Sequence, residues 1–310
     1  MSARTGNNGG TIAAFATVSL VWGSTWWVIK DQISSIPPGW TITWRFLLAS
    51  AAMMVLALLR GETLRIGRHG QVVAMMLGLL QFCTNYQFVY FAELHLTSGI
   101  VAVIYALLLV PNAALSTLLL KTHVSGRFML GSLVAILGIT LLLLHEGEHA
   151  AIHSALGSGA VGIGVLLSIA GLLAASGANV LQASGFAEGI GGVPLMAWAM
   201  VWGTLFDAAI ALVFDGAPGW EPNLRYWAGV AYLALIGSVV TFPLYHFLIR
   251  RMGAGQAAYT GVVTPVVAMG LSTAFEGYRW DVLAASGAVL AMLGLLIALS
   301  RPRIAANPSR

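Results

Sequence analysis

The sequence predicts an all-α polytopic membrane protein, with ten transmembrane helices arranged as two inverted five-helix repeats around a central cavity. The prediction rests on composition, on a pattern that occurs twice and on the distribution of basic residues. Hydrophobic residues fill 58% of the 310 positions and charged residues only 8%, and the mean hydropathy is +0.86. A soluble globular protein needs far more charge on its surface. The chain is therefore predicted to lie in a lipid bilayer.

The same arrangement of tyrosine, proline and glycine occurs in both halves of the chain. The two copies consist of Tyr105, Pro111, Gly131 and Gly138, and of Tyr259, Pro265, Gly287 and Gly294. The spacing from tyrosine to proline is six residues and that between the glycines is seven in each copy. The copies are offset by about 154 to 156 residues, as in an internal duplication. We expect a first repeat at 11–150 and a second at 151–300, with tails at 1–10 and 301–310.

A bilayer crossing needs about 20 mostly apolar residues, and breaks are expected where glycine, proline and charge cluster. These rules predict spans at 11–30, 38–59, 71–92, 97–120, 126–144, 158–183, 193–214, 226–249, 254–274 and 280–299. Because five spans per repeat is an odd number, the second repeat must insert upside down relative to the first.

Basic residues in the connections predict the orientation, because lysine and arginine are retained on the cytoplasmic side. With the N-terminus inside, eleven basic residues lie in cytoplasmic segments and three, Lys30, Arg225 and Arg279, lie outside. Both termini are therefore expected in the cytoplasm.

Polar and aromatic side chains within the spans are the candidate substrate site, because polar groups are costly in a bilayer. The predicted substrate-binding residues are Trp22, Trp26, Tyr86, Tyr90, Tyr105, Asn179, Tyr245, His246 and Tyr259. Their rings and neutral hydrogen-bonding groups suit an amphipathic organic solute. Helix packing is the alternative role for Trp22, Trp26 and Tyr86. His246 has a reference pKa closest to neutral and is the candidate for a proton-linked switch.

Proline and glycine in the repeated pattern suggest mechanical roles. Pro111 and Pro265 each remove a backbone hydrogen bond within a span and are predicted hinges, with a static kink as the alternative. The four repeated glycines return to one helix face every seven residues, which predicts close packing between helices.

Two charged residues lie inside predicted spans. Arg45 is about 10 Å into the second span at 1.5 Å per residue, and Asp207 lies in the seventh, its counterpart in the second repeat. They are expected to pair or to extend separately toward the interface, with a role in proton coupling as the alternative.

One motif suggests a different class of protein. His145, Glu146 and His149 match the H-E-x-x-H pattern of zinc proteases, and His153 continues the spacing. Gly147 weakens the helix that this motif needs. Because of this weakness, an intramembrane metalloprotease is kept only as the alternative function. No nucleotide-binding motif is present, so ATP-driven transport by this chain alone is not expected.

The order of Trp22-Gly23, Arg45-Phe46, the two tyrosine-to-proline segments and Phe275-Glu276 resembles the EamA-type repeat of the drug/metabolite transporter superfamily. The resemblance covers about 11–299 and is greatest to the YddG-type exporters of aromatic amino acids. Two positions depart from the family pattern: Lys121-Thr122 ends the fourth span, and Ala175-Ser176 stands where the first span has Trp22-Gly23.

The resemblance implies export of aromatic amino acids or similar small metabolites by alternating access, without enzymatic activity. It implies a small-molecule substrate and a lipid bilayer as partners, no cofactor and no nucleic acid. We expect the protein to act as a monomer.

Overall fold

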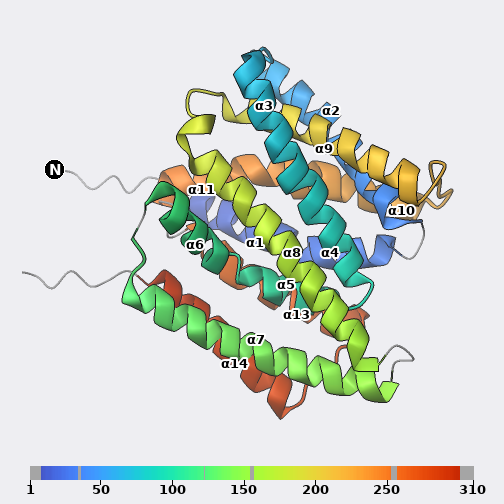
Figure 1. Ribbon diagram of the computed structural model, residues 1–310, viewed down its shortest axis with the longest axis vertical. Coiled ribbons are helices and arrows are strands. Elements are labelled where there is room, and N and C mark those ends of the chain that lie inside the picture. Colours follow the sequence, from blue (N-terminus) through green and yellow to red (C-terminus); the bar gives the residue numbers. More distant parts are fainter. Residues whose placement is uncertain (1–7, 34–35, 122, 154–156, 253–256, 301–310) are drawn as a thin grey trace, which may run out of the picture.

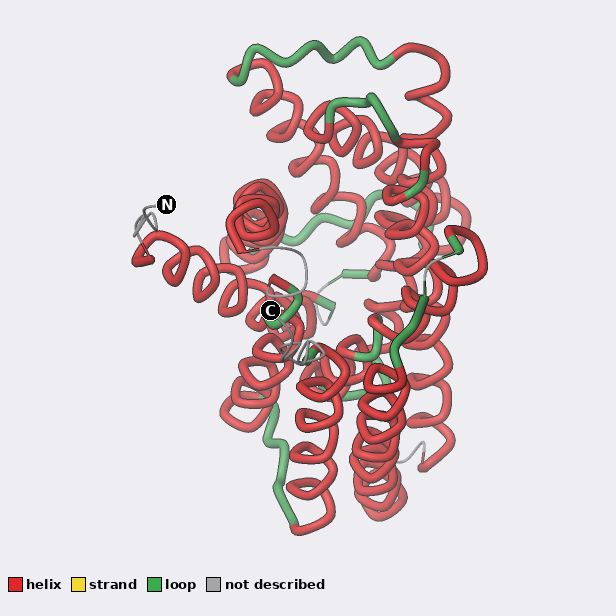
Figure 2. Tube along the Cα trace, turned by 90° about the vertical axis from the view of Figure 1, so that its left-hand side faces the viewer, coloured by secondary structure: helices red, strands yellow, loops and turns green. Residues whose placement is uncertain are grey.

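The computed structural model describes residues 8–33, 36–121, 123–153, 157–252 and 257–300. Within these ranges the chain forms helices and no strand, joined by short loops (Figure 2). Nine helical stretches are long and apolar enough to cross a membrane, and the shorter Thr260–Phe275 is a tenth. The ten predicted spans are confirmed at this level.

The first repeat contains five spans, of which the third and fourth are interrupted. Its elements are α1 (Asn8–Gln32), α2 (Pro38–Leu59), α3 (Gly67–Leu77), the π-helix η1 (Gly78–Thr84), α4 (Asn85–Glu93), α5 (Ser98–Ala106), α6 (Leu109–Leu120) and α7 (Gly126–His153). The second repeat follows the same plan. Its elements are α8 (Gly157–Ala183), the 3₁₀ turn η2 (Gly185–Ala187), α9 (Gly192–Phe214), α10 (Leu224–Ala231), the π-helix η3 (Tyr232–Val240), α11 (Thr241–Met252), α13 (Thr260–Phe275) and α14 (Val282–Leu299).

The helix contacts follow the duplication. Equivalent helices of the two repeats pack on each other in the pairs α2 with α9, α5 with α13 and α7 with α14. Contacts of α1 with α13 and α11 have their counterparts in contacts of α8 with α5, α6 and α4. Figure 1 shows α7 and α14 side by side at one edge of the molecule and α2, α3 and α9 at the opposite edge. This is the pairing expected when two inverted repeats meet around a two-fold axis.

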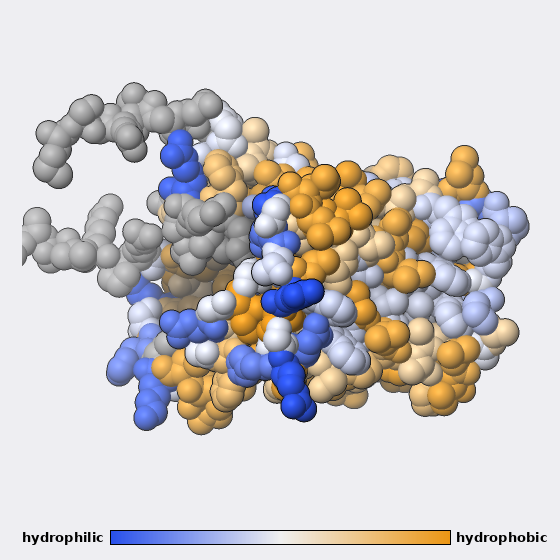
Figure 3. All heavy atoms as spheres, turned by 90° about the horizontal axis from the view of Figure 1, so that it is seen from above, coloured by the Kyte–Doolittle hydropathy of each residue, from blue (hydrophilic) through white to orange (hydrophobic). Residues whose placement is uncertain are grey.

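The surface has the character of a membrane protein. Large apolar side chains such as Leu59, Val213 and Phe214 are 80%, 76% and 81% exposed. On the face shown in Figure 3, apolar residues cover much of the surface and hydrophilic residues gather toward one end. Lipid tails can cover such a belt, whereas water would not tolerate it.

The four repeated glycines hold α7 against α14. A Cβ atom built on Gly138 would lie 2.2 Å from the backbone nitrogen of Ala291, and one on Gly294 would lie 2.2 Å from that of Ala135. Gly131 and Gly287 face the same interface, at comparable distances from backbone atoms. Backbones can approach this closely only where no side chain intervenes. The predicted packing role of these glycines is confirmed.

The fourth span breaks between Tyr105 and Pro111. The amides of Leu107 and Leu108 donate to carbonyls only three residues back, over 2.9 and 3.0 Å, and a new helix starts at Leu109. Pro111 cannot donate to the carbonyl of Leu107, which explains why the α-helical ladder stops here. In the second repeat Pro265 lies inside α13, and the corresponding break is at Ala258 and Tyr259, one turn earlier than expected.

The third and eighth spans contain the two π-helical segments. They start about 155 residues apart, which is the offset of the duplication. A π-turn adds one residue to the helical turn and is rare outside functional regions. Gly78 opens the first segment, where a Cβ would lie 2.6 Å from the carbonyl oxygen of Ala199 on α9. The equivalent spans of both repeats therefore share the same distortion.

We predict that Gly138→Ala destabilises the protein, because the added methyl group meets backbone atoms of α14 that cannot move without separating the helices. A loss of about 1–3 kcal/mol is the usual effect of overpacking. Thermal unfolding in detergent measures it. Gly270→Ala in α13 is the matched control, since a Cβ there meets nothing within 4 Å. Equal stability of the two variants would contradict the prediction.

Candidate functional site

An aromatic pair and an asparagine join three spans of the first repeat. Trp26 of α1 and Tyr105 of α5 have ring centroids 5.1 Å apart. The Tyr105 hydroxyl donates to Oδ1 of Asn85, at the start of α4, over 2.8 Å. All three spans contribute to one interior face, and Trp26 and Tyr105 are only half-buried. Neither ring is completely enclosed by its neighbours.

Arg45 of α2 lies beside this group and is 2% exposed. Its Nη1 donates to the Tyr90 hydroxyl over 3.3 Å and its Nη2 to the Tyr86 hydroxyl over 3.4 Å. The guanidinium carbon is 4.5 Å from the centre of the Tyr86 ring and 5.2 Å from that of Phe46. A cation over ring faces is a favourable contact. The sequence predicted a site lined by neutral groups, whereas the structure places a cation in it.

A second aromatic group lies about one turn closer to the N-terminus of α1. The Trp22 ring packs on Phe242 and Tyr245 of α11, with centroid distances of 6.0 and 5.1 Å. Its Nε1 donates to the carbonyl of Gly237 in η3 over 3.3 Å. Phe242 also belongs to the large core cluster that includes Trp26, Tyr86 and Tyr105. The two aromatic groups are therefore connected through the packing of α11.

Three residues missed by the sequence reasoning contribute here. Tyr232, the first residue of η3, shares a hydrogen bond of 2.6 Å with the Ser24 hydroxyl of α1. Tyr232 and Phe242 pack on the same cluster as Trp26. Both residues lie in apolar spans, and the sequence reasoning did not select them. The pairing of the third and eighth spans in the duplication was the available signal.

The remaining predicted residues lie apart from the first group. Asn179 of α8 donates to Asn112 of α6 over 3.4 Å. Tyr259 packs in a separate cluster with Leu107, Leu109 and Val262. The side chain of His246 lies outside the described part of the structure. The nine predicted residues therefore do not form one compact set.

Asp207 and Arg45 do not pair. Asp207 of α9 is fully buried, and its Oδ1 accepts from Nε2 of Gln87 over 2.9 Å. Arg45 also stays within the protein, so neither side chain extends to the interface. The ion pairs among the described residues join His145 to Asp281 and Asp31 to Arg225. The expected Arg45–Asp207 pair is wrong, because each side chain finds its partner on the third span.

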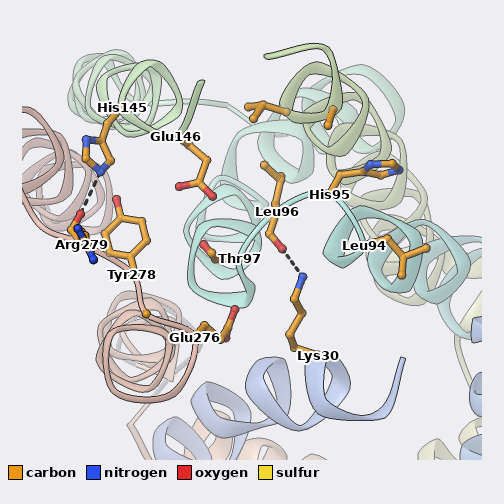
Figure 4. Close-up of a pocket in the computed structure, with 13 residues that line it drawn as sticks. Lys30, Leu94, His95, Leu96, Thr97, His145, Glu146, Glu276, Tyr278 and Arg279 are labelled. Carbon is orange, nitrogen blue, oxygen red and sulfur yellow. Dashed lines mark hydrogen bonds between the residues drawn. The ribbon is translucent and has the colours of Figure 1, made fainter. Parts of the chain in front are cut away.

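A cavity of about 480 Å³ opens at the predicted outer end, where α1 ends and α5 begins. Lys30, Glu146, Glu276 and Tyr278 are among its lining residues (Figure 4). Nζ of Lys30 donates to the carbonyl of Leu96 over 3.0 Å. Glu276 accepts from the backbone amide of Ser98 over 2.9 Å and also from its hydroxyl. None of the predicted substrate-binding residues with described side chains lines this cavity.

The structure gives the metalloprotease alternative no support. Nε2 of His145 donates to the carbonyl of Arg279 over 3.0 Å, and Nδ1 lies 3.1 Å from Oδ1 of Asp281. Both ring nitrogens therefore contact the connection before α14. The same Asp281 oxygen caps α14 by accepting from the amide of Ala284, which holds the pKa of Asp281 below its usual value. The side chains of Glu148, His149 and His153 lie outside the described part.

Several known proteins of similar sequence are named as transporters. The chain is 30% identical over 276 residues to the "uncharacterized inner membrane transporter YedA" of Escherichia coli K12, covering 85% of this chain and 82% of that protein. It is 27% identical to the "uncharacterized transporter YyaM" of Bacillus subtilis, over 92% of both chains. Protein PagO of Salmonella typhimurium is 29% identical, and that match spans 43% of each chain.

One solved crystal structure has the same fold, with a TM-score of 0.66 over 93% of this chain and 96% of that one. At 17% identity it bears on the fold alone. The EamA-like transporter family matches the chain twice, over residues 10–144 and 162–300. The two matches follow the two halves of the described helix bundle, and together they span most of the sequence. The chain therefore belongs to the EamA-like transporter family.

Proposed function

We propose that this transporter exports aromatic amino acids or similar small amphipathic metabolites from the bacterial cytoplasm by alternating access. It would act as a monomer in the inner membrane, with both termini in the cytoplasm and with repeats at 11–150 and 151–300. The observation that carries the proposal is the aromatic group of Trp26, Tyr86 and Tyr105, to which α11 adds Phe242.

The half-burial of these rings supports the proposed substrate class. Trp26, Tyr86, Tyr105 and Tyr232 lie in the interior of the bundle, yet each keeps accessible surface. A ring packed only for stability would be expected to lose that surface. Ring faces at this place can stack on an aromatic solute, while Asn85 and the tyrosine hydroxyls supply hydrogen bonds to its polar groups.

The packing of the fourth span supports alternating access. Eight of the nine residues of α5 are buried, whereas none of α6 is buried. The two segments differ although they belong to the same span, and the break at Leu107 and Leu108 separates them. Such a break lets one half of a span move while the other stays packed.

Contacts between the repeats join helices at the predicted outer end, beside the cavity described above. Asp31 pairs with Arg225 over 2.6 Å, and Gln32 donates to the carbonyl of Tyr226 over 3.0 Å. Ser98 is bound by Glu276. Since α5 is buried and α6 is not, we infer that these contacts hold the outer halves of the spans together in this structure. Export would require these contacts to open in each cycle.

Transport by purified protein in liposomes tests the proposed function. Labelled phenylalanine should enter protein-containing vesicles unchanged and faster than it enters empty ones, and unlabelled tryptophan should compete. Repeating the assay with an imposed pH gradient distinguishes proton-coupled from facilitated transport. The absence of protein-dependent uptake of every aromatic solute tested would refute the proposed substrate class.

We predict that Trp26→Ala weakens transport of phenylalanine about two- to tenfold, because one ring–ring contact contributes about 0.5–1.5 kcal/mol beyond burial. Transport of alanine should change much less. The ratio of the two rates is the measurement, since it cancels differences in protein yield. Trp220→Ala is the control, because Trp220 is 70% exposed and its ring packs on Trp227 near the predicted outer surface. An unchanged ratio in Trp26→Ala would remove this residue from the site.

We predict that Pro111→Ala slows turnover more than it weakens substrate binding. Restoring an amide donor at this position favours a hydrogen bond to Leu107 and a continuous helix across the break. Stopped-flow uptake and equilibrium binding separate the two effects. Pro265→Ala should act in the same direction but less, because the second break lies further from its proline. Unchanged turnover in both variants would reduce the prolines to packing residues.

A further inference from the structure

Arg45 is a buried cation that the fold alone does not explain. Its side chain is 2% exposed, and none of the ion pairs within 4 Å among the described residues includes it. Its recorded side-chain hydrogen bonds go to two tyrosine hydroxyls and are long, at 3.3 and 3.4 Å. Nε has no hydrogen-bond partner. A guanidinium has five N–H donors, and removing it from water without an anion is costly.

The position of Arg45 coincides with the aromatic group. Arg45 lies seven residues from the first residue of α2, Tyr86 seven from the last of α4, and Tyr105 seven from the first of α5. All three of these helix ends face the predicted outer side, so the three residues lie at about the same depth, roughly 10 Å at 1.5 Å per residue. Tyr86 contacts the guanidinium and packs on the same cluster as Tyr105.

We propose that Arg45 is the anchor for a carboxylate of the transported solute and that it determines specificity for anionic head groups. The inference rests on the proposed function, since the solute's ring would occupy the neighbouring aromatic group. A guanidinium forms paired, charge-assisted hydrogen bonds to a carboxylate. The tyrosine hydroxyls accept one hydrogen bond from each of the two Nη atoms of Arg45. Nε has no partner and is a further donor for a ligand. The site would thus prefer a solute with a ring and a carboxylate to one with a ring and an amino group but no carboxylate.

Glu93 is the alternative partner within the protein. It lies one turn beyond Tyr90 on α4, is fully buried and interacts electrostatically with Arg45. Neither carboxylate oxygen has a hydrogen-bond partner, and the pair is not within ion-pair distance. At this distance Glu93 does not occupy the donors of the guanidinium. A carboxylate on the solute would reach those donors directly.

A series of four ligands tests the proposal on the wild-type protein. Phenylalanine and 3-phenylpropionate carry a ring and a carboxylate, whereas phenylalaninol and phenethylamine carry a ring and an ammonium group but no carboxylate. Equilibrium binding to full-length protein in detergent is measured by calorimetry or by ligand-dependent thermal stability. We expect both carboxylates to bind about tenfold more tightly or better than both amines. Similar affinities across the series would overturn the proposal, while binding as such would leave the proposed function standing.

Variants of Arg45 then assign the preference to this residue. In Arg45→Gln the ratio of phenylalanine to phenylalaninol affinity should fall about 10- to 100-fold, and Arg45→Lys should retain part of it. Arg68→Gln is the matched control, because it removes one exposed arginine in the first turn of α3, at the predicted cytoplasmic end. Its ratio should equal that of the wild type.

The outcomes separate a binding role from a structural one. Loss of affinity for both ligands by the same factor in Arg45→Gln would make Arg45 a structural residue and overturn the inference. Should Arg45→Gln not yield monodisperse protein, the four-ligand series on the wild type decides alone. If the wild type binds none of the four compounds, the proposed function fails and this inference fails with it.

Discussion

The bilayer requires every backbone amide and carbonyl to find its partner within the protein, because lipid tails supply none. This constraint explains where the helices of this transporter are irregular. The break at Leu107 and Leu108 is bridged by hydrogen bonds to carbonyls three residues back instead of four. Within η3, the side chain of Ser238 donates to the carbonyl of Leu233, five residues back. Irregular backbone is confined to spans that pack against other spans around the aromatic group. The helix distortions and the proposed substrate contacts would therefore share the same interior region.

The duplication gives the two repeats equal frameworks but different chemistry. The glycine pairs of α7 and α14 and the π-helical segments recur at equivalent places. The side chains around the aromatic group do not recur. Arg45 in the first repeat has Ala199 at the equivalent position of the second. The helix framework of the two repeats is thus nearly symmetric. The side chains that a solute would meet are not.

The spans and the glycine packing could be predicted because both depend on local composition and spacing. The partners of Arg45 and Asp207 could not, since charge and depth alone made them candidates for each other, whereas the third span lies between them and offers Tyr86, Tyr90 and Gln87. The sequence also carried no signal for the π-helical segments. Nothing in the sequence distinguishes Gly78 from other glycines of the spans, and only its contact with α9 in the folded protein does so. The break in the second repeat lies one turn before the place that the first repeat suggests. Proline marks where a helix is weak, whereas packing decides which turn opens.

The pairing of α7 with α14 has a consequence for how the chain is made. The two helices carry the closest backbone approach in the bundle, yet almost half of the sequence separates them. During synthesis α7 enters the bilayer with its glycine face unpaired, and its partner α14 emerges only after the other described helices of the second repeat. Until then the small side chains of α7 are available to a wrong neighbour, including the same helix of another nascent chain. The insertion of α14 then covers this glycine face.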